Sequence, residues 1–319
     1  MKFAGLAAFL VGACLLFALV IQAGLAPVLS VLGTMGAQGL VLVSLAHLPI
    51  VALLGLAWWM IYRSGKRPTL PRFVWARAVR DASAEALPFS QLGGYAIGAR
   101  ALSLAGADAT AAGASTFLDL ILEFAAKLPY ILLGLALLAN LRSERIVSVA
   151  LLVLCLGTLL MLPLLREPLQ KLARLKLFPR WQGLRSTRRR AALALGRMTA
   201  KGKSFAASIL LHLACWILGA GETWLIFHFM RVAVPLDASL VIDSLVGAIR
   251  AASFFVPGAI GVQEGGYILL CGLFGISPAT ALAFSLARRA RDLLIAAPVL
   301  LSWQWREARS FFSAGTRWR

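Results

Sequence analysis

Long apolar runs recur along the whole chain. They span Phe3–Ile21, Leu40–Tyr62, Phe117–Leu138, Ile146–Leu165, Phe205–Met230 and Leu282–Trp303. Each run is close to the roughly 20 residues that a helix needs to cross about 30 Å of hydrocarbon. Buried helices of a soluble protein would carry polar faces, which these runs lack. The pattern therefore predicts an all-α, polytopic membrane bundle with about six full spans.

Two further stretches, Ala82–Leu104 and Leu240–Phe274, are interrupted by proline and glycine. Proline removes a helical hydrogen bond and glycine allows the chain to turn, so we expect a broken helix in each stretch. The predicted breaks are at Pro88, Gly93, Gly94, Pro257, Gly258 and Gly261. Each stretch is then expected to form a re-entrant hairpin that returns to the side from which it came.

An ordered set of landmarks occurs twice, within and just after these two stretches. The first copy consists of Ala82-Ser83, Pro88, Gly93-Gly94-Tyr95, Ala109-Thr110-Ala111, Ser115 and Pro129. The second copy, about 170 residues later, consists of Ala252-Ser253, Pro257, Gly265-Gly266-Tyr267, Ala279-Thr280-Ala281, Ser285 and Pro298. Alanine, serine and glycine are common in this chain, but the conserved order of the landmarks favours an internal repeat. We expect one membrane domain, 1–319, with repeat halves at 38–165 and 204–303. Membrane repeats of opposite topology are typical of transporters.

Composition agrees with a membrane protein, and charge sets its orientation. Hydrophobic residues make up 60% of the chain and charged residues 14%, and the net charge is +19. The basic residues gather in 63–80, 166–203 and the tail 304–319, which the positive-inside rule places in the cytoplasm. This predicts a multi-pass protein of the cell inner membrane. The basic segments lack interleaved aromatic residues, so we expect them to contact anionic lipid headgroups and not nucleic acid.

The same rule orients the two hairpins. Two long crossings lie between the basic segments 63–80 and 166–203, so the first hairpin must return to the cytoplasm. The second must enter from the outside, because the crossing Leu282–Trp303 leads back to the basic tail. The halves are therefore predicted to form an inverted repeat. Segment 166–203 is too short for a soluble catalytic domain and is expected to form an amphipathic surface helix.

Several other features are interpreted as structural. The apolar run after Lys2 is long for a signal peptide, so a retained first helix is preferred over a signal cleaved near Ala23. The four cysteines lie singly in apolar runs and indicate packing residues. His47, His212 and His228 lack the spacing of a metal site. We expect neither a metal nor a cofactor.

Ionisable residues inside the predicted membrane segments mark the candidate site. Inserting such a group at the middle of the membrane costs about 2.5–3.5 kcal/mol, so it usually faces protein or water. The candidate substrate-binding residues are Glu85, Arg100, Arg250, Glu264, Arg288 and Arg291. Arginine suits bidentate contacts to phosphate or polyol oxygens. The cluster Arg288–Asp292 is open to a second interpretation, as an interfacial group near the end of its helix.

A second charged set lies on one predicted helix. Asp119, Glu123 and Lys127 recur every four residues. Residues at this spacing share one helix face, so the three can pair along it. For this set we favour a buried structural pair over a substrate site.

The sequence contains no P-loop, no G-x-S-x-G motif and no Asp-rich pair that would hold Mg²⁺. It does contain Ala-Leu-Pro at 86–88, then Gly93-Gly94 and Arg100, and later Pro-Gly-Ala-Ile-Gly-Val-Gln-Glu at 257–264 before the arginines near 288–291. This pattern resembles the lysylphosphatidylglycerol synthase transmembrane (flippase-like) family. The more specific second stretch matches at Pro257, Gly258, Gly261, Glu264 and Arg288 or Arg289. It departs from the family pattern at Ala259, which replaces a glycine, and at Gln263, where a basic residue is common.

The resemblance implies a stand-alone translocation module without the soluble transferase domain of the full-length enzymes. The chain looks most like the hopanoid-biosynthesis-associated subgroup. We therefore expect a lipid translocator of the bacterial inner membrane that moves hopanoids or a related polar-headed lipid toward the outer leaflet or outer membrane. Lipid-biosynthesis proteins are expected partners. The alternatives are an integral-membrane lipid-modifying transferase and a non-transporting scaffold of a lipid-biosynthesis complex.

Overall fold

The computed structural model describes residues 2–63, 67–86, 90–142, 185–199, 202–253 and 256–315. Within these ranges the chain is helical and has no strand, which confirms the all-α class. The elements are α1 (Lys2–Ala23), α2 (Leu25–Ile61), α3 (Leu70–Ala86), α4 (Ser90–Leu104), α5 (Ala109–Arg142), α7 (Arg185–Thr199), α8 (Gly202–Phe229), α9 (Leu236–Ala252), the 3₁₀ turn η2 (Pro257–Ala259), α10 (Val262–Gly272) and α11 (Pro278–Gly315). The predicted span Ile146–Leu165 and the predicted break at Pro88 lie outside the described residues.

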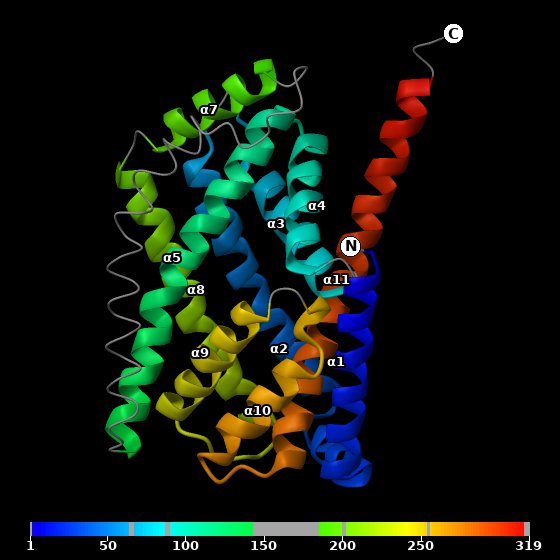
Figure 1. Cartoon of the computed structure of the whole chain (residues 1–319), viewed down its shortest axis with the longest axis vertical. Coiled ribbons are helices and arrows are strands. Elements are labelled where there is room, and N and C mark those ends of the chain that lie inside the picture. Colours follow the sequence, from blue (N-terminus) through cyan, green and yellow to red (C-terminus); the bar gives the residue numbers. More distant parts are fainter. Residues whose placement is uncertain are drawn as a thin grey trace.

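Four long helices, α2, α5, α8 and α11, run between the two ends of the molecule (Figure 1). Of these, α2, α5 and α8 are long and apolar enough to cross a membrane. The fourth, α11, has 38 residues and carries the charged cluster 288–292 within its length. Large apolar side chains such as Phe17, Leu269 and Leu301 are exposed on the outside of the bundle. Exposed apolar surface of this kind is what lipid tails contact.

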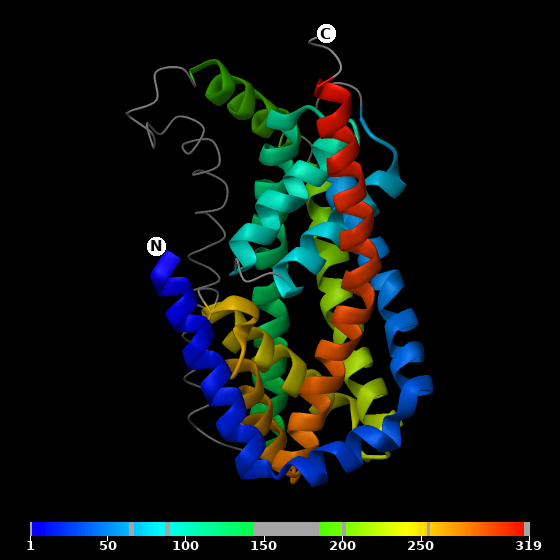
Figure 2. The same ribbon diagram turned by 90° about the vertical axis from the view of Figure 1, so that its right-hand side faces the viewer.

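The first helix and the start of α2 form an arm along one side of the bundle. Gly36 has a φ of 62°, a left-handed conformation that glycine adopts without strain, and α2 changes direction there. Figure 2 shows the segment before Gly36 running along the lower end of the molecule, with α1 rising from it. Because α1 packs against α10 and α11, the arm encloses the second hairpin.

Two helical hairpins enter the bundle from opposite ends and meet near its middle (Figure 1). One consists of α3 and α4 and starts at the end where α2 finishes. The other consists of α9 and α10 and starts at the end where α8 finishes. In the second hairpin the chain turns through Gly258 and Gly261, whose φ angles are 59° and 78°. Glycine has no Cβ and adopts these angles readily, so the two predicted breaks coincide with the observed turn.

The first hairpin uses its glycines differently from the prediction. Gly93 and Gly94 lie inside α4 and not at a break. A Cβ on Gly94 would lie 2.7 Å from the Cβ of Ala84 and 2.8 Å from the carbonyl oxygen of Arg80. The glycine therefore lets α4 approach α3 closely; α3 ends at Ala86 and α4 begins at Ser90.

The apolar core has one part around each hairpin. At the α9–α10 end, the ring of Phe284 meets those of Phe227 and Tyr267 at centroid distances of 4.4 and 4.8 Å. At the α3–α4 end, Trp58 meets Phe73 at 5.6 Å. The basic helix α7 lies across this end and contributes apolar side chains to that cluster. Each hairpin is thus fixed in its own apolar cluster, and the region between their tips is left to polar groups.

Candidate functional site

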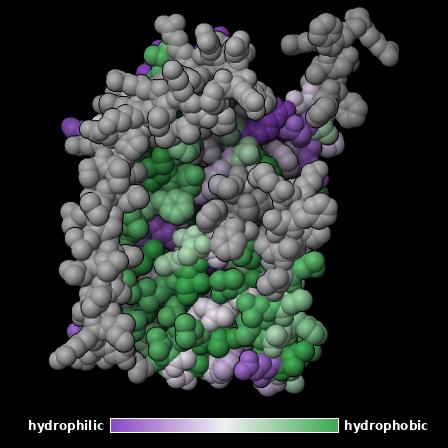
Figure 3. Space-filling model, in the orientation of Figure 1, coloured by the Kyte–Doolittle hydropathy of each residue, from purple (hydrophilic) through white to green (hydrophobic). Residues whose placement is uncertain are grey.

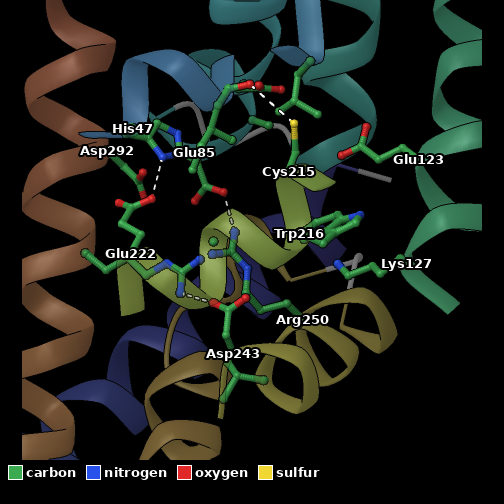
Figure 4. Close-up of a pocket in the computed structure, with 18 of the residues that line it drawn as sticks. His47, Glu85, Glu123, Lys127, Cys215, Trp216, Glu222, Asp243, Arg250 and Asp292 are labelled. Carbon is green, nitrogen blue, oxygen red and sulfur yellow. Dashed lines mark hydrogen bonds and ion pairs between the residues drawn. The ribbon is translucent and has the colours of Figure 1, made fainter. Parts of the chain in front are cut away.

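A cavity of about 220 Å³ lies where the two hairpins meet, and its walls also come from α2, α5, α8 and α11. Among the described residues, six basic and six acidic side chains line it, together with His47. Figure 4 shows labelled members of this set converging from several helices. On the outside, Figure 3 shows a hydrophilic patch at mid-height of a largely hydrophobic face. Charges at this depth are costly unless they face one another or water, so they are a candidate functional site.

The wall formed by α3 and α5 holds a buried ion-pair network. Arg77 and Arg80 lie one turn apart on α3, with exposed side-chain fractions of 3% and 2%. Arg80 contacts Asp119 and Glu123 of α5, each at 2.7 Å. Arg77 contacts the same two acids at 3.3 and 3.2 Å, and Asp81 of its own helix at 2.7 Å. The two arginines therefore share three carboxylates and tie the first hairpin to a long helix.

This network differs from the predicted pairing along α5. The acids at 119 and 123 are engaged by arginines from another helix, and His212 of α8 also contacts Asp119 at 3.2 Å. Lys127, the expected partner of Glu123, instead lies over the ring of Trp216, 4.3 Å from its centroid. Arg77 and Arg80 were not among the predicted site residues, because 63–80 was interpreted as an orientation signal. Their spacing beside Asp81 was the available clue to a buried helix face.

The tips of the two hairpins are joined by an ion pair. Arg250 near the end of α9 donates to the carboxylate of Glu85 near the end of α3. Figure 4 shows these two side chains pointing toward one another across the cavity. The backbones approach closely as well, because a Cβ on Gly258 would lie 3.8 Å from the carbonyl oxygen of Glu85. Both residues of this pair were predicted as substrate-binding residues.

On the opposite wall, the arginines of α11 reach acids on two other helices. Arg288 donates to Asp243 of α9 at 2.5 Å, and Asp243 also accepts from the hydroxyl of Tyr130 at 2.8 Å. Arg291 pairs with Glu222 of α8 and with its neighbour Asp292. Every one of these contacts lies between helices or within α11, so the cluster is part of the cavity wall and not an interfacial group at the helix end.

A histidine extends this wall to α2. His47 lies 2.8 Å from the second carboxylate oxygen of Glu222. Both residues were missed by the sequence reasoning, since each stands alone within a long apolar run and their separation is 175 residues. No local spacing connects them, and only the packing of α2 against α8 brings them together.

Glu264 is buried behind the cavity and holds the second break in place. Its carboxylate accepts from the backbone N–H of Gly261 at 2.7 Å, from the hydroxyl of Ser285 at 2.9 Å and from Arg289 at 2.7 Å. Arg289 also donates to the carbonyl of Gly258 at 3.1 Å. This carboxylate therefore caps α10 and ties the turn to α11.

The six predicted binding residues thus occupy three kinds of position. Glu85, Arg250, Arg288 and Arg291 line the cavity, while Glu264 lies behind it. Arg100 faces away from it, with 48% of its side chain exposed, and pairs with Glu307 of α11 at 2.7 Å. Within the described residues, no group of three or more histidine, cysteine or acidic side chains is arranged to hold a metal ion.

Replacing Glu264 with alanine is expected to destabilise the protein by about 1–3 kcal/mol, because the Gly261 N–H and Arg289 would lose their buried acceptor. Thermal unfolding of the detergent-purified variant would measure this loss. Glu307→Ala is the matched control, since it removes an exposed ion pair that contributes about 1 kcal/mol or less. Equal melting temperatures for the two variants would contradict the structural role of Glu264.

Comparison with known proteins supports a membrane assignment. No curated protein and no solved structure matches the chain. A family model described as the lysylphosphatidylglycerol synthase TM region matches residues 5–299. The matched range contains both hairpins and every residue that lines the cavity. This chain therefore belongs to the lysylphosphatidylglycerol synthase TM region family.

Proposed function

We propose that the protein translocates a polar-headed lipid across the bacterial inner membrane. The headgroup would enter the charged cavity while its apolar tail stays in the bilayer. The observation that carries this proposal is the placement of paired charges at mid-height between two hairpins, inside a bundle with an apolar exterior. Ionisable groups at this depth usually mark a substrate path. Hopanoids with a polar headgroup and polar-headed phospholipids are the candidate substrates.

The opposed hairpins suggest how such a site could open alternately to the two faces. In transporters built from inverted repeats, substrate binds near the midplane at the repeat interface, and rocking of the halves changes its access. We propose that the α3–α4 and α9–α10 hairpins belong to the two repeat halves. The Glu85–Arg250 pair lies between their tips and would form and break as the halves move.

Membrane lipidomics of a deletion strain tests the proposal against the two alternatives. If the protein is a translocator, its lipid should still be synthesised but should be misplaced between membrane fractions. If it is a transferase, the product itself should be missing. An Arg288→Gln variant should fail to restore the distribution, because the cavity would lose the cation that contacts Asp243. A scaffold would tolerate that substitution, so full complementation by Arg288→Gln would contradict translocation.

The proposed orientation places the basic segments in the cytoplasm, and thiol labelling can test it. After the native cysteines are replaced, single cysteines at Ser186 and Ser313 should be shielded from an impermeant reagent outside intact cells. Cysteines at Gly33 and Leu236, at the opposite end of the bundle, should be labelled. Labelling of Ser186 and protection of Leu236 would reverse the orientation.

A further inference from the structure

Among the residues that the structure describes, one cation of the cavity wall, Lys127, lacks a carboxylate partner. The arginines at 77, 80, 250, 288 and 291 all contact an acid. Lys127 makes no hydrogen bond or ion pair with any residue that the structure describes, although it lines the same cavity. Its neighbour one turn away, Glu123, is held by two arginines of α3. An uncompensated cation away from bulk water is costly, so we look for a partner that the described residues do not supply.

Trp216, whose ring faces the Lys127 ammonium, also has a hydrogen-bond donor without a described partner. The ammonium of Lys127 lies 4.3 Å from the ring centroid of Trp216. The indole N–H of Trp216 is buried and has no acceptor within the described part of the chain. Figure 4 shows the two side chains together on one side of the cavity, away from His47 and Asp292. This side of the wall therefore offers two donors that make no hydrogen bond with any described residue.

The acidic side chains of the cavity, unlike Lys127, all have ion-pair partners. Each of the six lining carboxylates accepts from at least one arginine, so none is free to receive a ligand ammonium. A headgroup that carried a positive charge would add a cation beside Lys127 and find no available acid. A headgroup that carried a negative charge would find both unpartnered donors.

There is also room beside the ammonium. Gly247 of α9 faces Lys127, and a Cβ built on it would lie 3.5 Å from Cε and 3.9 Å from Nζ of the lysine. Both residues line the cavity, and glycine places no side chain between α9 and the ammonium. A larger side chain there would occupy the space next to Nζ without changing any charge.

We propose that Lys127 and Trp216 form an anion subsite that binds the phosphate of a lipid headgroup, and that the cavity accepts anionic headgroups without an ammonium group. A phosphate has several acceptor oxygens, so one group can receive both the lysine and the indole donors. The proposal rests on the proposed function and narrows its substrate from polar-headed lipids in general to anionic phospholipids. A neutral polyol headgroup would leave Lys127 uncompensated.

Binding to the purified full-length protein in detergent tests the subsite. The probes are short-chain phosphatidylglycerol, short-chain diacylglycerol with the same tails, and inorganic phosphate. We expect the phosphatidylglycerol to bind at least about tenfold more tightly than the diacylglycerol, and Lys127→Gln to remove about tenfold of that affinity. Lys127→Arg should keep most of it, since the charge remains. Arg231→Gln, which removes an exposed cation outside both the cavity and the basic segments, is the matched control and should bind like the wild type.

Gly247→Leu provides a second variant that leaves the charge in place, and it should weaken phosphatidylglycerol binding as strongly as Lys127→Gln. Wild-type affinity in both variants would overturn the subsite. Diacylglycerol binding as tight as phosphatidylglycerol would do the same. Inorganic phosphate that bound as tightly as the lipid would overturn the assignment to a headgroup.

The result is separable from the lipidomics experiment. Lysine-dependent binding in a protein whose deletion misplaces no lipid would refute translocation and leave the subsite standing. Normal lipid distribution with Lys127→Gln in a strain that depends on the protein would refute the subsite and leave translocation standing.

Discussion

Replacing Arg80 with alanine is expected to destabilise the protein by about 3–5 kcal/mol, because it leaves three carboxylates around the single arginine Arg77, and so an uncompensated buried charge. Its guanidinium is 2% exposed and contacts Asp119 and Glu123, each at 2.7 Å. Asp119 is fully buried, and only Arg77 and His212 would remain near it. A loss of this size is comparable to the net stability of many domains. Little folded protein should therefore be recovered.

Thermal unfolding and the yield of monodisperse protein in detergent would measure this effect. The control is Arg100→Ala, which removes an arginine whose side chain is 48% exposed and pairs with an acid at the surface. Such a pair contributes about 1 kcal/mol or less. Combining Arg80→Ala with Asp119→Asn should recover part of the stability, since one uncompensated charge is removed. A stable Arg80→Ala variant would show that the network is not required for folding.

The hairpins were the part of the fold most accessible from the sequence. Their second break depends on Gly258 and Gly261, which are local features with a direct conformational consequence. The positions of the basic segments predicted that the two hairpins begin on opposite sides, and the hairpins do start at opposite ends of the bundle. The positions of Gly93 and Gly94 were misread, because glycine serves both turns and close helix packing, and sequence does not distinguish the two uses.

The sequence predicted the partners of the charged residues much less well. Helical spacing correctly placed Asp119, Glu123 and Lys127 on one face, but their partners come from α3 and α8. Contacts such as His47 with Glu222 depend on the packing of helices that are distant in the chain. Arg100 was chosen for its place in a hairpin, yet the outward face of α4 carries it to the surface. Which face of a hairpin turns inward is a property of tertiary packing.

Reversing the charge of Arg250 is expected to abolish the proposed lipid translocation. Arg250→Glu would place two carboxylates in contact where Arg250 and Glu85 now form an ion pair between the hairpin tips. Two like charges about 4 Å apart repel by about 4 kcal/mol at the effective dielectric constant of partly buried sites. This repulsion would disfavour the state in which the tips meet, and it exceeds the 1–3 kcal/mol of a typical conformational coupling. The lipid distribution in a complemented deletion strain would report the loss.

The double variant Glu85→Arg with Arg250→Glu separates the contact between the hairpins from the identity of the charges. If the pair acts by holding the tips together, the exchanged pair should restore the contact and most of the translocation. Expression and melting temperature of the single and double variants would show whether folding itself has changed. Arg309→Glu, at an exposed position on α11 outside the cavity, should leave translocation unchanged and controls for charge reversal as such. If translocation persisted in Arg250→Glu, the contact between the hairpin tips would not be needed for it. Any arrangement that brings two negative charges together at these positions costs several kcal/mol.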